Sequence, residues 1–183
     1  MLFFLTLTFG IYLVFIIFII SGLFKHNILE ISSSDKLPKV SVIIAARNEE
    51  ENLPLLIQDI INQEYPLDKI ETIIVNDRST DLTSEIIKEA SENYSFIKHI
   101  RIQDKNHHMA PKKHAITLGI ENCEGEVVVA TDADCRVGRF WVSSMVYSVI
   151  KKNSIAIGYS SVSGNSFFEK YQMIDFLGIL SAN

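Results

Sequence analysis

The fold is decided by one short stretch, VVVATDADC at residues 127–135. Its first four residues are apolar, which is typical of a strand buried on both faces inside a parallel sheet. Asp132 and Asp134 follow directly, so they fall at the carboxyl end of this strand, where open α/β sheets bind their ligands. We therefore expect an α/β fold with a ligand site at that edge.

Asp132 and Asp134 are candidate metal ligands. Two residues apart in an extended chain, their side chains point to the same side. Two carboxylates about 5 Å apart repel by roughly 3 kcal/mol at an effective dielectric constant near 20, and a divalent cation turns that repulsion into attraction. Hard oxygen ligands suit Mg²⁺ or Mn²⁺. The alternative is that both acids are solvated loop residues or a helix cap.

Strand and helix patterns alternate on both sides of this stretch. Strands are predicted at residues 40–46, 70–75, 97–102 and 127–130, with 154–159 as a possible further strand. Helices are predicted at 53–61, 82–90, 112–120 and 141–150. Asn48, with Glu51 three residues later, is the expected N-cap of the first helix, and Leu82 is expected to face the core. The alternation predicts a Rossmann-like, mostly parallel sheet flanked by helices.

The chain begins with an apolar segment. No residue between Leu2 and Phe24 is charged, and about 20 apolar residues are enough to cross a bilayer as a helix. Lys25, Lys36 and Lys39 follow this segment and no basic residue precedes it, which by the positive-inside rule places the remainder in the cytoplasm. We expect a single-pass cell-membrane anchor at 1–25, a serine-rich linker at 26–37 and one domain at 38–183.

Composition excludes several classes of protein. The net charge of −5 and the lack of a Lys/Arg-rich run argue against a nucleic-acid surface. The two cysteines, Cys123 and Cys135, cannot form a disulfide framework or a zinc site. Neither G-x-G-x-x-G nor G-x-x-x-x-G-K-[ST] occurs, which excludes the usual dinucleotide and P-loop sites.

Polar residues follow three of the predicted strands. Because the carboxyl ends of parallel strands share one edge, Asp77 is expected to face the same crevice as Asp132 and Asp134. Residues 79–81 are also suited to cap the next helix, and Asp77 to a turn. Lys112 and its basic neighbours open a helix, where the helix dipole disfavours cations. These residues are either solvated or bind a phosphate. Because the chain has no glycine-rich phosphate loop, the phosphate would have to belong to a metal-bridged diphosphate.

Four motifs in this order resemble family 2 glycosyltransferases of GT-A fold. They are VSVIIAARNEE at 40–50, NDRSTD at 76–81, KKHA at 112–115 and DAD at 132–134. The resemblance implies an inverting, metal-dependent transfer from a nucleotide-sugar, with UDP-sugar as the expected donor. It assigns Asp77 to the nucleobase, Lys112 to the diphosphate, and Asp132 and Asp134 to the Mn²⁺ or Mg²⁺ ion. Asp132 would also contact the donor sugar, and the nucleoside pocket would be formed by Ala46, Arg47, Asn48 and Glu49.

The acceptor half of such an enzyme is not evident in this sequence. Ala45, Asn76 and Arg78 stand where a proline, an acid and a glycine are frequent in the family. Glu169 and Asp175 read as polar-face residues of an amphipathic segment, so the general base is expected beyond Asn183 and the chain is expected to be the N-terminal portion of a longer enzyme. The acceptor would be a glycan or a lipid-linked molecule, as in polysaccharide biosynthesis.

Two other functions compete with this interpretation. A sugar nucleotidyltransferase has a similar sheet, although the loop after the first strand here lacks the glycines that such enzymes carry. A non-catalytic subunit that binds a nucleotide-sugar would need the donor residues alone.

Overall fold

The computed structural model describes residues 2–23, 37–104, 108–152, 155–158, 166 and 168. The chain divides into two compact units, Glu30–Ala156 and a second unit of Met1–Leu29 with Ile157–Asn183. In the second unit the described part is mainly helix α1 (Leu2–Leu23), whose 22 residues carry no charged side chain. Among the helices as described, none has both the length and the apolar character that crossing a membrane requires.

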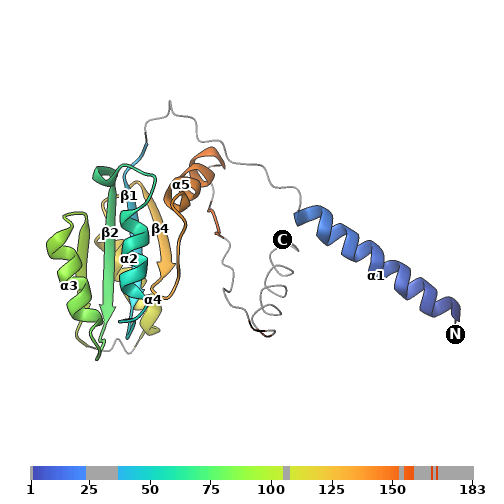
Figure 1. The fold of residues 1–183 in the computed structure, drawn as a ribbon, viewed down its shortest axis with the longest axis horizontal. Coiled ribbons are helices and arrows are strands. Elements are labelled where there is room, and N and C mark those ends of the chain that lie inside the picture. The colour runs from blue at the N-terminus through green and yellow to red at the C-terminus, as the bar shows by residue number, and fades with distance from the viewer. Residues whose placement is uncertain are drawn as a thin grey trace. The chain divides into compact units, whose positions relative to one another are not determined.

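A four-stranded parallel sheet forms the centre of the unit Glu30–Ala156 (Figure 1). The strand order is β3-β2-β1-β4, so β1 lies between β2 and β4. In the register, Ala46 pairs with Asn76 and Ala45 pairs with Asp132, which brings the carboxyl ends of these strands to one edge. The strands are β1 (Val40–Ala46), β2 (Ile70–Asp77), β3 (Ile97–Ile102) and β4 (Val127–Asp132). The predicted parallel α/β sheet is confirmed.

Helices cover both faces of this sheet. The helical elements of this unit are α2 (Leu53–Ile61), the short 3-10 helix η1 (Leu67–Lys69), α3 (Thr83–Asn93), α4 (Pro111–Glu121) and α5 (Trp141–Lys152). Helices α2, α3 and α5 share one hydrophobic core with the sheet, and α4 packs on a separate cluster that includes Ile73 and Val75 of β2. The fold is therefore three-layered, with helices on each side of the sheet.

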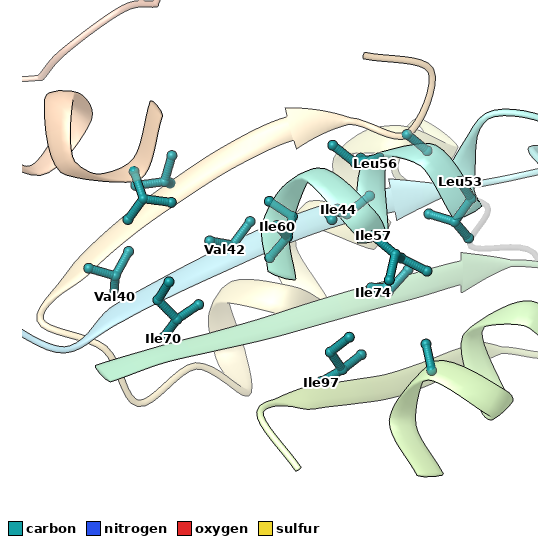
Figure 2. Packing of buried hydrophobic residues seen from close by; sticks show 14 of the residues in the cluster. Val40, Val42, Ile44, Leu53, Leu56, Ile57, Ile60, Ile70, Ile74 and Ile97 are labelled. Atoms are coloured by element: carbon teal, nitrogen blue, oxygen red, sulfur yellow. The ribbon is translucent and has the colours of Figure 1, made fainter. Parts of the chain in front are cut away.

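The larger core depends on the alternation of β1 and on the apolar face of α2. Figure 2 shows Leu56 and Ile60 of α2 lying over Val42 and Ile44 of β1. Ile43 points to the opposite face, where α4 approaches so closely that a Cβ atom on Gly119 would lie 2.5 Å from its Cγ2 atom. A glycine at this position is what allows the helix to pack directly on the strand.

Three predictions about elements were wrong. Strand β4 is not buried on both faces. Val128 is 42% exposed, because α4, on that side of the sheet, packs on β1 and β2. Residues 155–158, within the possible strand at 154–159, have no regular structure. Leu82 is 62% exposed, since it precedes α3 as its N-cap residue and does not belong to the helix's buried face.

A buried carboxylate links the strands at the opposite edge of the sheet. Glu71, only 3% exposed, accepts hydrogen bonds from Ser41 Oγ, from the Glu124 backbone N–H, from Gly125 N–H at 2.9 Å and from Lys98 Nζ at 2.9 Å. Burial alone would raise the pKa of Glu71, but the hydrogen bonds from Lys98, Ser41 and Glu124 outweigh burial and lower the pKa to about 2. Ionised Glu71 therefore stabilises the fold.

We predict that this stabilisation depends on pH. Because the folded-state pKa of Glu71 lies below its unfolded value, the contribution is complete above about pH 4.5 and is lost as pH falls towards 2. Glu71→Gln should lower the free energy of unfolding by roughly 3 kcal/mol at pH 7 and by much less near pH 2. Urea denaturation at pH 7, 5 and 3 measures the difference. Glu92→Gln, at an exposed pair with Lys88, is the control and should cost less than about 0.5 kcal/mol. A difference independent of pH would contradict the assignment.

Candidate functional site

A pocket of about 260 Å³ opens at the carboxyl edge of the sheet. It is formed by the ends of β1, β2 and β4 together with the first residues of α4. Its lining residues are Ala45, Ala46, Arg47, Glu49, Asp77, Pro111, Lys112, Ala115, Asp132, Ala133 and Asp134. Seven of the eight site residues predicted from sequence lie in this pocket. The exception is Asn48.

Asn48 supports the pocket wall from the loop after β1. Its backbone has a left-handed φ of 56°, a conformation that asparagine tolerates better than most residues. Its side-chain Oδ1 accepts a hydrogen bond from Thr80 N at 2.9 Å, and its own N–H donates to Ser79 Oγ at 3.1 Å. The prediction that Asn48 caps the next helix was wrong. Helix α2 begins at Leu53, with Asn52 at the N-cap position and a proline in its first turn.

The loops after β1 and β2 are joined by further hydrogen bonds. Glu49 N–H donates to Thr83 Oγ1 at 2.8 Å, and Glu50 N–H donates to Asp81 Oδ2 at 3.2 Å. In return, Leu82 N–H donates to Glu50 Oε2 at 2.9 Å. Asp81 also accepts from the N–H of Thr83, the first residue of α3, at 3.1 Å. The N-cap position of α3 is nevertheless Leu82, which makes no side-chain capping hydrogen bond, so the predicted cap at residues 79–81 is not formed. The two loops therefore hold each other in place.

Asp77 is the most deeply placed carboxylate of the pocket, with its side chain 7% exposed. Arg78 Nε lies 2.7 Å from Asp77 Oδ1, and Arg78 Nη2 lies 3.2 Å from Oδ2. Arg47 adds a longer contact, with Nη1 3.9 Å from Oδ2. Asn76 Oδ1 accepts a hydrogen bond from Ser79 N–H at 3.0 Å and so closes the turn that carries these residues.

Asp132 and Asp134 occupy different kinds of backbone. Asp132 is the last residue of β4, whereas Asp134 lies in a turn closed by Cys135 N–H donating to the Asp132 carbonyl at 3.2 Å. The prediction that both residues lie in extended chain was therefore wrong, because the strand ends at Asp132. Both residues nevertheless line the pocket.

Lys112 pairs with Asp132 in this structure. Its Nζ atom lies 2.7 Å from Oδ1 and 2.8 Å from Oδ2. The lysine at the start of α4 thus has a partner within the chain, which the sequence did not indicate. The first helical hydrogen bond here runs from His114 N–H to the Ala110 carbonyl, so the N–H of Lys112 lies ahead of it. Both side chains are more than half exposed, so the pair itself contributes little to stability.

Helix α2 and the residues just after it fix the segment that follows the paired aspartates, which sequence reasoning missed. Asp59 accepts hydrogen bonds from Arg136 Nε at 2.6 Å, Arg136 Nη2 at 2.7 Å and Val137 N–H at 3.1 Å. The Arg136 hydrogen bonds lower the pKa of the Asp59 carboxyl. Gln63 adds bonds to the Gly138 carbonyl and the Val142 N–H, both at 2.9 Å. These partners are 75 or more residues apart in sequence, and no local motif signals such contacts.

The charge of the pocket follows from its lining. Four carboxylates, from one glutamate and three aspartates, stand against the two cations of Arg47 and Lys112. At neutral pH the lining residues alone carry a formal charge of −2, and Arg78, which contacts Asp77 but does not line the pocket, reduces the local charge to −1. Among the residues that the structure describes, no three His, Cys, Asp or Glu side chains form a group able to hold a metal ion. The two carboxylates of Asp132 and Asp134 suit Mg²⁺ or Mn²⁺, which bind through one or two protein carboxylates and complete their shell with water and substrate phosphate.

A family model for "Glycosyl transferase family 2" matches residues 41–180, which include the whole pocket. The chain belongs to glycosyl transferase family 2. Among curated members, it is 37% identical over 129 residues to a probable glycosyltransferase of Bacillus subtilis, YdaM, covering 67% of this chain and 30% of YdaM. It is 34% identical over 113 residues to a beta-monoglucosyldiacylglycerol synthase of Nostoc sp., covering 62% and 23%. The chain therefore spans less than a third of the length of these relatives.

Two solved structures share the fold. The mannosyltransferase PcManGT from Pyrobaculum calidifontis, in complex with GDP-Man and Mn²⁺, aligns with a TM-score of 0.62 and 26% identity, covering 77% of this chain and 40% of that one. S. aureus TarS 1–349 in complex with UDP-GlcNAc aligns with a TM-score of 0.52 and 21% identity, covering 69% and 38%. At 21% identity, the alignment with TarS shows a shared fold alone.

We predict that the joined loops depend on Asn48. Asn48→Ala removes the acceptor for Thr80 N–H and places alanine at a left-handed φ, so it should lower the free energy of unfolding by about 1–3 kcal/mol. Asn48→Gly loses the same hydrogen bond without the backbone cost and should destabilise less. Thermal and urea unfolding of both variants measures the order. Equal destabilisation by both would show that the backbone conformation at residue 48 carries no cost.

Proposed function

We propose that this family 2 glycosyltransferase transfers a sugar from a nucleotide-diphosphate sugar, with UDP as the expected nucleotide, and that a divalent cation accompanies the donor. The proposal is supported by one observation above the others, the net negative charge of the pocket. Its four carboxylates, from Asp77, Asp132, Asp134 and Glu49, outnumber the cations even when Arg78 beside Asp77 is counted. An anionic diphosphate would be repelled by such a pocket. A divalent cation entering with the diphosphate reverses that repulsion.

In this proposal, different pocket residues contact different parts of the donor. Asp77 would accept a hydrogen bond from the nucleobase, beside Ala46, Arg47 and Glu49 at the nucleoside. Asp132 and Asp134 would hold Mn²⁺ or Mg²⁺. When bound, the metal neutralises diphosphate oxygens and takes up charge that develops on the leaving group.

Lys112 changes partner in this proposal. In the structure its ammonium neutralises Asp132. A metal ion on Asp132 would compete with the ammonium, which would then be free to interact with the diphosphate at the start of α4. The same lysine would therefore pair with Asp132 in the empty pocket and with the diphosphate once the donor and metal are bound.

For the acceptor, we propose only its chemical class, a lipid or a glycan. Inversion at the anomeric carbon needs a base to deprotonate the acceptor hydroxyl. The pocket carboxylates described above are assigned to the donor. The relatives include enzymes named beta-monoglucosyldiacylglycerol synthase and poly-beta-1,6-N-acetyl-D-glucosamine synthase, which supports a lipid or glycan acceptor. Family membership argues against the sugar nucleotidyltransferase alternative, and no observation specifically favours a non-catalytic subunit.

Calorimetric titration of UDP into the full chain tests the donor proposal. With Mn²⁺ present, we expect binding at least about tenfold tighter than with a chelator, which corresponds to about 1.4 kcal/mol. Asp134→Asn should remove most of this difference by weakening the metal. Asp68→Asn is the matched control, because Asp68 is an exposed carboxylate in η1, outside the pocket. Equal affinity with Mn²⁺ and with chelator, unchanged in Asp134→Asn, would refute the metal's role.

We further propose that residues 2–24 attach the protein to the cell membrane, with the pocket on the cytoplasmic side. The support is the lack of charged residues in this segment and the lysines Lys25, Lys36 and Lys39 after it. The test is a topology reporter fused after Lys39, combined with carbonate extraction of membranes. We expect activity from a cytoplasmic reporter and retention in the pellet. Activity from a reporter that works only outside the cytoplasm, or release by carbonate, would overturn this assignment.

A further inference from the structure

Arg78 combines an unfavourable backbone with a highly specific side-chain contact. Its φ is 55°, in the left-handed region that costs free energy for a residue with a side chain. Within the described residues, one other non-glycine residue shares this feature, and that residue is Asn48, whose type tolerates it. A long arginine has no such tolerance. An observed conformation of this kind beside a pocket is grounds for asking what the side chain does.

The guanidinium of Arg78 holds the carboxylate of Asp77. It donates to both oxygens, at 2.7 Å to Oδ1 and 3.2 Å to Oδ2. Arg78 does not line the pocket itself. It borders a neighbouring hollow with Ser79, Arg101, Ile102 and Gln103, so it fixes Asp77 while leaving the front of that side chain facing the pocket. A planar fork that binds both oxygens restricts carboxylate rotation more than a single contact does.

We propose that Arg78 is a positioning residue that sets the nucleobase selectivity of this pocket, favouring uracil or guanine over cytosine or adenine. This inference rests on the proposed function, because it takes Asp77 as the residue that meets the base. Arg78 acts through Asp77 and does not touch the nucleotide.

The selectivity follows from the hydrogen-bonding character of an ionised carboxylate. Such a group only accepts hydrogen bonds. Uracil presents a ring N–H, and guanine presents a ring N–H beside an amino group. Cytosine and adenine carry a ring nitrogen lone pair next to their amino group. This lone pair would face a carboxylate oxygen of Asp77, and two acceptors repel each other. Because Asp77 is buried and held in one orientation, it cannot turn away from the mismatch or recover water, and the wrong base is disfavoured.

A purely structural role for Arg78 makes a different prediction. The hydrogen bond from Ser79 N–H to Asn76 Oδ1 closes the turn and could by itself impose the left-handed φ. In that case glycine at residue 78 would be at least as good, and nucleotide preference would not change. The two roles are therefore separated by a readout of selectivity rather than of stability.

The experiment measures dissociation constants for UDP, GDP, CDP and ADP with Mn²⁺, on the full chain and on its variants. The wild-type chain should prefer UDP or GDP over CDP and ADP. Arg78→Gly relieves the backbone while releasing Asp77, so the thermal midpoint should change little, whereas the preference should fall by about tenfold, as expected for loss of one aligned charge-assisted hydrogen bond. Arg78→Lys, which keeps the charge without the fork, should fall between. Arg101→Ala removes an arginine from the same hollow and should keep the wild-type preference.

A double-mutant cycle with Asp77→Asn completes the test. If Arg78 acts through the carboxylate, Arg78→Gly should have no effect on preference when Asp77 is already asparagine. Failure of the wild-type chain to bind any of the four nucleotides would refute the proposed function. Binding with an unchanged preference in Arg78→Gly, or a wild-type preference for CDP or ADP, would overturn the role of Arg78 alone.

Discussion

The parallel pairing of β1 with both of its neighbours is the constraint on which the site depends. Because Ala46 lies opposite Asn76 and Ala45 lies opposite Asp132, the strands end level with one another. Residues distant in sequence are thereby delivered to one edge without any direct contact between their side chains being required. Helix α4, packed closely through Gly119, brings Lys112 to the same edge.

This arrangement concentrates negative charge, and the surrounding structure manages it. Arg78 and Lys112 each neutralise one carboxylate, and the loops after β1 and β2 hold each other through backbone-to-side-chain hydrogen bonds. The remaining excess of negative charge would favour a cation in the pocket. A rigid, negatively charged pocket at the carboxyl ends of a parallel sheet is well suited to a metal-bridged diphosphate.

The fold was largely predictable because hydrophobic period and strand length are local signals. The strands at 40–46 and 97–102 have the predicted bounds, and the pocket follows from parallel topology. The failures lie where a non-local contact decides or where a local turn ends a strand. Asn48 binds the neighbouring loop and not its own helix, and Asp134 enters a turn that ends the strand. The anchoring of Arg136 by Asp59 joins segments 77 residues apart, which no periodicity reveals.

The central claim is that a divalent cation bridges Asp132 and Asp134 to the diphosphate of a nucleotide. Anomalous scattering at the manganese absorption edge, from crystals of the protein grown with UDP and Mn²⁺, tests this directly. The account predicts a manganese peak between the two carboxylates and the diphosphate, with Lys112 released from Asp132. A diphosphate bound in the pocket without a manganese peak, and with the Lys112–Asp132 pair intact, would contradict it.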